Sequence, residues 1–546
     1  MSDLIIFLLA IRVFICEKVW PIAGIFWDIC FCVCFALYAI LDSKIIINRK
    51  IVFYPLVLSC FLLINILFSL NAYNTQNEAL KFLIYLLIFT YVYWQSLEKR
   101  KILLSAIIFT GALISVRAVY QYFTGMAYIN QHYSYAQIIN QGFYAWEMLK
   151  QRRVISWFFA PNLLAGYLLM IALLCGGYLF KSYQKKQIKQ SIFFLIIFLL
   201  LSSGLFLTRS IGASLIFIFA ICFLSGDLLK VADKKSVIKQ RIIIGVLLLL
   251  VFGVMLAPRA KYFLDLNNPQ NSLLQRLAYW QSSVKLIQEN LLTGIGLGNF
   301  GIIYPCFKQP QANETIYAHN LFLQLWAETG TIGFFFFLFF LVYFVIRRLK
   351  QPRDLMENSL IVASLGFLVY NLVDYSFFIS QAGYIWIILT ACLFKPKLDL
   401  SSEKNNGGGT AVFFAKSVYI LISGLIIFYL SLEYKSQILL DEAYLSMENK
   451  KVNSAIAQAN KALNFRKNND AIYYFLAVCY SWQTKEIFSP QVVEYYHKAI
   501  SLNPKYAFYY YYLSKYYFSF QMYAEGAVYK LKALSFYPGN KKFAAE

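Results

Sequence analysis

Long apolar stretches alternate with short polar ones along this chain, and this pattern predicts a bundle of membrane helices. Twelve stretches near 20 residues have the length and composition needed to cross the hydrocarbon core of a bilayer. They are 20–41, 51–70, 79–97, 102–121, 160–181, 191–208, 211–229, 242–257, 319–346, 359–375, 377–394 and 411–432. A thirteenth stretch, 4–16, is short and carries Arg12, and we interpret it as a retained first helix, tilted or half inserted. The predicted fold is all-α, with a polytopic bundle of 12–13 spans over residues 1–432.

The distribution of Lys and Arg among the loops predicts the orientation of this bundle. Cations cluster on alternate loops, and the short loops at 71–78 and around 376 have none. Because cytoplasmic loops carry the excess of Lys and Arg, the basic loops are predicted to be cytoplasmic: 42–50, 98–101, 181–190, 230–241, 347–358 and 395–410. Loops 122–159 and 258–318, and everything after 432, are then extracytoplasmic.

Residues 437–546 contain a repeated pattern. Lys461-Ala462-Leu463, Lys498-Ala499-Ile500 and Lys532-Ala533-Leu534 recur at spacings of 37 and 34 residues, and prolines follow the last two. A period near 34 residues is typical of tetratricopeptide repeats, so the tail is predicted to be a C-terminal α-solenoid of this kind. Its aromatic runs, Tyr509 to Tyr512 and Tyr516/Tyr517, either stack on sugars or fill contacts between repeat helices.

Composition supports the membrane assignment and limits the chemistry. The chain is 60% hydrophobic and its mean hydropathy is +0.57, outside the range of soluble proteins. The net charge of +23 follows from the loop pattern, so we expect no nucleic-acid partner. Of the ten cysteines, eight lie in apolar segments, and no His or carboxylate cluster has the spacing of a metal site. We therefore expect neither a metal nor a cofactor.

His319 is the main candidate for proton transfer. It stands where the longest polar loop, 258–318, meets an apolar stretch, and the chain has only three histidines. Imidazole accepts a proton near neutral pH, as a general base must. The alternative is a structural histidine that caps the following helix.

Arginines at the outer edge of the bundle are candidates for binding an anion. Arg153 precedes the span that begins near Pro161-Asn162 and faces outward against the charge rule, which an anionic headgroup would explain. Arg209 lies in a tight outer hairpin at nearly intramembrane depth. Arg276 falls in a helix predicted over 272–290, where it could equally be an ordinary surface cation.

A glycine turn follows that helix in the loop 258–318. The run Gly294-Ile295-Gly296-Leu297-Gly298 is weak evidence for a nucleotide site, because no strand precedes it. We interpret it as a turn that brings the backbone close to a phosphate or to another helix.

Four elements in this order resemble the O-antigen ligase / O-antigen polymerase / bacterial O-oligosaccharyltransferase superfamily. They are R-x4-F-x2-P-N-x2-A-G-Y at 153–167, T-x-S-x-G-A at 208–213, R-x3-W with G-I-G-x-G-x-F at 276–300, and H-N-x2-L-Q-x3-E-x-G-x2-G at 319–333. The resemblance covers roughly residues 150–335, and the remaining spans agree in architecture only. One position departs from the pattern: many members have arginine where this chain has Ile211, and Arg209 stands two places earlier.

The resemblance implies a metal-independent glycosyltransferase at the outer face of the bacterial inner membrane. Its donor would be an undecaprenyl-diphosphate-linked glycan, and its acceptor a hydroxyl of lipid A core or of a protein. His319 would be the catalytic base, and the substrate-binding residues would be Arg153, Arg276, Arg209, Asn162, Asn320, Gly294 and Gly298. A polysaccharide polymerase of the same chemistry, or a transporter or scaffold whose repeats bind a protein partner, are the alternatives.

Overall fold

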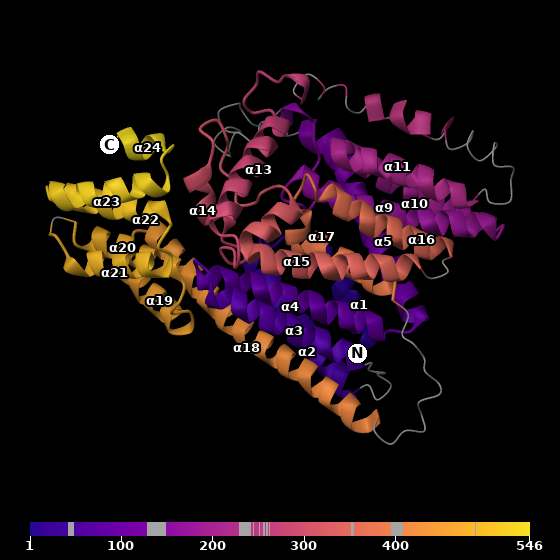
Figure 1. Cartoon of the computed structure of the whole chain (residues 1–546), viewed down its shortest axis with the longest axis horizontal. Coiled ribbons are helices and arrows are strands. Elements are labelled where there is room, and N and C mark those ends of the chain that lie inside the picture. The colour runs from indigo at the N-terminus through magenta and orange to yellow at the C-terminus, as the bar shows by residue number, and fades with distance from the viewer. Residues whose placement is uncertain are drawn as a thin grey trace.

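The computed structural model describes residues 1–41, 49–127, 149–228, 242–243, 245–250, 252–254, 257, 260, 263–350, 354–394, 408–485 and 487–545. Throughout these residues the regular elements are helices, as the all-α prediction requires (Figure 1). The predicted loop 230–241, and most of the predicted loops 42–50, 122–159 and 395–410, lie outside the described residues.

The N-terminal and central helices coincide with the predicted apolar stretches. They are α1 (Ser2–Ile11), η1 (Arg12–Phe14), α2 (Pro21–Leu41), α3 (Arg49–Leu67), α4 (Ala72–Trp94), α5 (Leu97–Tyr120) with η2 (Gln121–Gly125), α9 (Pro161–Gln184), α10 (Ile188–Leu207), α11 (Ile211–Leu228), α15 (Leu321–Leu349), α16 (Leu355–Tyr370), η3 (Ser376–Phe378), α17 (Ser380–Cys392) and α18 (Gly408–Glu448). Six helices in the described part are long and apolar enough to cross a membrane, and five shorter apolar helices match further predicted spans. The total of twelve or thirteen spans stays a prediction.

Helix α9 forms the centre of the bundle. It is buried along most of its length and packs against α5, α10, α11 and α16. Pro161 occupies its first turn, where the missing N–H of proline leaves no hydrogen bond unmade. This fixes the N-terminal end of α9, with Asn162, next to the loop that carries Arg153.

Two helices of the loop 258–318 cover one end of the bundle. Helix α13 (Ser272–Glu289) confirms the helix predicted over 272–290, and Asn271 caps it by accepting a hydrogen bond from the Leu273 N–H. Helix α14 (Phe300–Phe307) follows the glycine turn, and both helices pack on α15. The loop predicted to be extracytoplasmic is therefore a small packed helical layer.

Helix α18 runs without a break from the last predicted span into the C-terminal region (Figure 1). The sequence placed the end of the membrane domain at 432 and the start of the repeats at 437, and both positions fall inside this helix. A fall in hydropathy does not end a helix, and the stretch from Leu432 to Gln437 contains neither Gly nor Pro.

The C-terminal array consists of α19 (Val452–Phe465), α20 (Asp470–Gln483), α21 (Pro490–Leu502), α22 (Ala507–Ser519), α23 (Tyr523–Phe536) and α24 (Lys541–Ala545). Consecutive helices pack on one another, and the array lies beside α13 and α14 (Figure 1). The assignment to tetratricopeptide repeats stays a prediction. Tyr509, Tyr510, Tyr511, Tyr516 and Tyr517 are buried between its helices, so these rings fill interhelical contacts.

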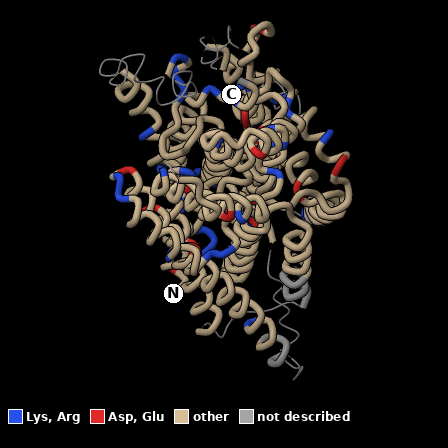
Figure 2. Tube along the Cα trace, turned by 90° about the vertical axis from the view of Figure 1, so that its left-hand side faces the viewer, with Lys and Arg blue, Asp and Glu red and all other residues tan. Residues whose placement is uncertain are grey.

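Charged residues are sparse along most of the chain. Figure 2 shows long uncharged stretches of the trace, interrupted by clusters of Lys and Arg and of Asp and Glu. Five charged residues line one cavity, described next: Lys18, Glu78, Arg153, Arg276 and Glu314.

Candidate active site

A cavity of about 1370 Å³ opens where α13, α14, the start of α15 and the C-terminal array meet. It is larger than the roughly 300–1,000 Å³ of pockets for drug-sized ligands, so it suits a bulky substrate. Its lining includes five of the residues singled out from the sequence: His319, Arg153, Arg276, Asn162 and Gly298. The cavity therefore joins the loops 122–159 and 258–318, which are far apart in the chain.

His319 lies in the connection that precedes α15, with a φ of 52°. Its ring stacks on Tyr279 with 5.3 Å between ring centroids, and meets the ring of Tyr375 edge-on at 4.7 Å. The Nδ1 atom is buried and has no hydrogen-bond partner among the described residues. Burial, and to a lesser extent the charge of Arg276, lower the pKa of His319 to about 3. The imidazole is therefore neutral at physiological pH, with an unpaired Nδ1, and is a weaker base than a solvated histidine as long as no anion offsets Arg276.

The residue after it, Asn320, caps α15. Its side-chain oxygen accepts hydrogen bonds from the N–H groups of Phe322 and Leu323, and the Leu321 N–H donates to the Asn371 carbonyl at 2.8 Å. The capping role that His319 could have filled thus belongs to Asn320. Asn320 lies outside the cavity lining and positions His319 through the backbone.

Arg153 and Asn162 form one side of the cavity. The Arg153 Nε donates to the Thr208 carbonyl at 2.9 Å, and its Nη2 donates to Asn162 Oδ1 at 2.6 Å. The guanidinium is thereby held in a fixed plane at the N-terminal end of α9. A planar, fixed guanidinium is suited to bidentate contact with a phosphate.

Arg209 lies outside the cavity lining. Its Nη1 donates to the Gln151 carbonyl, and its Nη2 donates to the Tyr122 hydroxyl at 3.3 Å. These bonds connect the hairpin between α10 and α11 to η2 and to the segment that carries Arg153. Arg209 therefore stabilises the position of the segment that carries Arg153 without lining the cavity.

Two more cations complete the positive wall of the cavity. Arg276 comes from α13, and its Nε is buried without a hydrogen-bond partner among the described residues. Lys18, from the turn before α2, also lines the cavity, with its Nζ 5.5 Å from the centre of the Tyr317 ring. A buried guanidinium nitrogen that lacks a partner is unfavourable in isolation and is satisfied when an anion binds beside it.

The glycine turn serves mainly to bring two segments together. Gly294 and Gly330 both have positive φ, and a Cβ on Gly294 would lie 2.5 Å from the Gly330 nitrogen. The Gly330 conformation interrupts α15, so the Gly296 N–H can donate to the Glu328 carbonyl at 2.9 Å. Gly294 therefore contacts another helix, whereas Gly298 lines the cavity. Of the two interpretations of this turn, the close helix contact applies to Gly294.

Sequence reasoning missed Lys18, Glu78 and Tyr375. Each is a single polar or aromatic residue in a short connection or at the start of an apolar helix, without a motif around it. The signal that could have drawn attention to Lys18 is the charged Glu17-Lys18 pair between two apolar stretches. Its position on the same cavity as His319 depends on tertiary packing.

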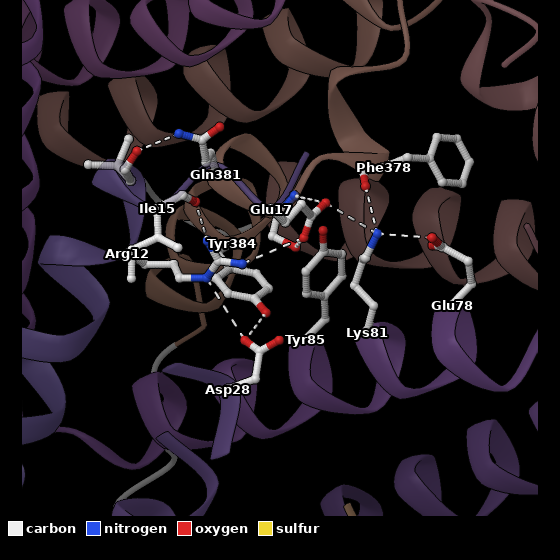
Figure 3. A network of polar contacts seen from close by, with 12 residues as sticks. Arg12, Ile15, Glu17, Asp28, Glu78, Lys81, Tyr85, Phe378, Gln381 and Tyr384 are labelled. Atoms are coloured by element: carbon white, nitrogen blue, oxygen red, sulfur yellow. Dashed lines mark hydrogen bonds and ion pairs between the residues drawn. The ribbon is translucent and has the colours of Figure 1, made fainter. Parts of the chain in front are cut away.

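A buried polar network connects this missed region to the bundle (Figure 3). Lys81 lies 3.5 Å from Glu17 and 3.1 Å from Glu78, which lines the cavity, and donates to the Phe378 carbonyl at 3.0 Å. Burial alone would raise the pKa of Glu17, but Lys81 and Arg12 bring it down to about 2. The network joins the N-terminal segment, α4 and the start of α17 beneath the cavity.

The residues around the cavity offer no ligand set for a metal. In the part of the chain that the structure describes, no three His, Cys, Asp or Glu side chains are grouped closely enough to hold an ion. Chemistry without a metal stays a prediction for this site.

Comparison with known proteins gives one match. Residues 196–338 match the family model described as O-antigen ligase, a range that contains Arg276 and His319. No curated protein and no solved structure matches the chain. The match agrees with the resemblance seen in the sequence motifs, so this part of the chain is similar to the O-antigen ligase family.

Proposed function

We propose that this protein is a membrane glycosyltransferase of O-antigen ligase type. It transfers glycan from an undecaprenyl-diphosphate carrier to a hydroxyl of lipid A core or of a protein, at the outer face of the bacterial inner membrane. The observation that carries the proposal is the cavity in which a neutral, unpaired His319 faces the cations Arg276 and Arg153.

The chemistry divides between these groups. His319 takes the proton of the acceptor hydroxyl, whose oxygen then attacks the anomeric carbon of the donor sugar as the bond to the diphosphate breaks. The leaving diphosphate gains negative charge, which Arg276 and Arg153 stabilise by charge-assisted hydrogen bonds. Bound diphosphate also offsets the effect of Arg276 on His319, so the imidazole becomes a stronger base once the donor is present.

The match at residues 196–338 favours glycan chemistry over the transporter or scaffold alternative, because it contains both His319 and Arg276. Ligase and polymerase share the bond-forming step and differ in their acceptor. Deleting the gene separates them: loss of capped lipid A core indicates a ligase, loss of glycosylated protein a protein transferase, and loss of long chains with single units retained a polymerase.

Substitution of His319 tests the mechanism. We expect His319→Ala to lower transfer by about 10²–10⁴-fold, the usual contribution of a general base, while the protein still reaches the membrane at normal level. His497→Ala is the matched control, because His497 is exposed on the C-terminal array and pairs with the Tyr529 hydroxyl at 2.7 Å, away from the cavity lining. Full glycan transfer by the His319→Ala protein would refute the assignment of the base.

A further inference from the structure

The C-terminal array forms a wall of the same cavity that contains His319. Tyr506, Phe508 and Tyr537 line the cavity from the array, together with Ala507. Tyr506 and Phe508 are only half-buried, so part of each ring remains open, in contrast to the buried Tyr509 that follows them. The rings of Tyr506 and Phe508 lie side by side, with 5.5 Å between their centroids.

A buried carboxylate fixes this wall to the membrane bundle. Asp470 accepts a hydrogen bond from Asn71, at the start of α4, at 2.9 Å. Its other oxygen accepts from Asn503 at 2.9 Å and from the Tyr509 hydroxyl at 2.7 Å, on either side of the turn that carries Tyr506. These three hydrogen bonds offset part of the cost of burying the carboxylate. They also hold the aromatic wall in place relative to the bundle.

A second anchor lies at the other edge of the wall. The Tyr537 hydroxyl contacts Glu314, and Lys308 donates to the same hydroxyl at 3.1 Å. Asn313, the neighbour of Glu314, donates to the Gln270 side chain at 2.8 Å. Asn313, Gln270 and Asn268 all line the cavity, so the aromatic rings and these amide groups share one cavity.

We propose that this wall is a pyranose-binding subsite, in which Tyr506 and Phe508 stack on a sugar ring and the amides of Asn268, Gln270 and Asn313 bind its hydroxyls. Aromatic faces are negative and attract the C–H face of a sugar, and amides both donate and accept hydrogen bonds, as hydroxyls require. The rings themselves do not favour a phosphate, because their faces are negative. The subsite rests on the proposed function, since the sugar belongs to its donor or acceptor glycan.

Glycan binding by the purified full-length protein tests this subsite. Two lipid-free probes are titrated by calorimetry: the repeat-unit oligosaccharide released from its lipid carrier by mild acid, and the core oligosaccharide released from lipid A. We expect Tyr506→Ala and Phe508→Ala each to weaken binding of one probe roughly three- to tenfold, the range of an aromatic contact. An effect on the first probe assigns the subsite to the donor glycan, and an effect on the second assigns it to the acceptor.

Three further variants distinguish loss of the sugar contact from a general loss of binding or of transfer. Tyr506→Phe keeps the ring and should bind like the wild type, and Tyr523→Ala, an exposed tyrosine of the same array outside the cavity, should also be unchanged. His319→Ala should bind both probes normally while losing transfer, so failure of the proposed function would appear as transfer that survives this substitution. Absence of binding by the wild type, or unchanged affinity in both Tyr506→Ala and Phe508→Ala, would overturn the subsite.

Discussion

At the scale of single residues, the cavity contains the desolvated imidazole of His319 and two guanidinium groups, those of Arg153 and Arg276, which differ in their hydrogen bonding. Arg153 is fixed by hydrogen bonds to Thr208 and Asn162, whereas the Nε of Arg276 is buried without a partner among the described residues. Arg276 is therefore the group with the most to gain when an anion binds. Its charge also lowers the pKa of His319, so the two residues are coupled before any substrate arrives.

Substitution of the arginines should separate these roles. We expect Arg276→Ala and Arg153→Ala each to lower the rate of transfer by about 10²–10³-fold, the usual loss when one stabilising donor is removed. Lysine should restore little, because it cannot make the planar two-point contact with a phosphate. Arg209→Ala should leave donor use closer to normal and lower the thermal stability instead. A larger loss of donor affinity for Arg209→Ala than for Arg276→Ala, in a donor-binding assay, would contradict this assignment.

The pH dependence of transfer reports the environment of His319. In the free protein its pKa of about 3 lies below the ordinary 6.5, so the imidazole stays neutral as the pH falls from about 7 to 5. The pH dependence of kcat/KM reports groups of the free enzyme, and that of kcat reports groups of the substrate complex. We therefore expect protonation of His319 to cause no fall in kcat/KM between about pH 7 and pH 5. The acid limb of kcat should lie at higher pH, because the bound diphosphate raises the pKa of His319. Initial rates in proteoliposomes would measure both, and an acid limb of kcat/KM near pH 6.5 would show that His319 is not desolvated.

At the scale of elements, the interruption of α15 at Gly330 builds the site. It lets the glycine turn reach the carbonyls of α15, and this contact sets the position of α13 and α14 relative to His319. The wall of the cavity therefore depends on backbone packing between two glycines.

Replacing one of these glycines should disrupt the outer layer. In Gly294→Ala the new Cβ would lie 2.6 Å from the Glu328 carbonyl oxygen, at a φ of 69° that L-residues disfavour. We expect a loss of more than about 2 kcal/mol in unfolding free energy, the range of strained substitutions at special φ. Gly424→Ala is the control: nothing lies within 4 Å of its Cβ, and alanine in a helix interior gains up to about 1 kcal/mol. Thermal unfolding in detergent, followed by circular dichroism, would compare them, and equal stability of the two variants would contradict the close contact.

Local patterns in the sequence predicted the elements well. Apolar runs predicted the helices of the bundle, and helical spacing predicted α13 almost to the residue. Hydropathy did not predict that one helix continues through the junction of 432 and 437, because it reports the surroundings of a helix and not where the helix ends. The continuity of α18 depends instead on the absence of a helix-breaking residue.

The motifs drew attention to several residues that share one cavity, whereas residues that only packing brings there were missed. His319, Arg153, Arg276, Asn162 and Gly298 share one cavity. Tyr506 lies 187 positions after His319 in the sequence and Lys18 lies near the N-terminus, so no local spacing connects them to the motifs. The aromatic run that follows Tyr506 drew attention by its composition, yet its rings are mostly buried.

At the scale of the whole molecule, the cavity joins the membrane bundle and the C-terminal array into one site. The array contributes Tyr506 and Tyr537 to the cavity of His319, so both must lie on the same side of the membrane. This argument is independent of the loop charges, which predict that side to be extracytoplasmic. The array is thus predicted to form part of the active site, and not only to bind protein partners.

A reporter fused after Glu546 tests this arrangement. The predicted cytoplasmic loop 395–410 carries Lys395, Lys397 and Lys404, and one apolar stretch, 411–432, separates it from the array. A reporter that is active only in the periplasm should therefore work at this position, and a reporter that is active only in the cytoplasm should not. Fusions within loop 395–410 are the matched control and should give the reverse pattern. Because His319 and the array share one cavity, a cytoplasmic signal after Glu546 would also put His319 on the face opposite the lipid-linked glycan, and the transferase proposal would fail with it.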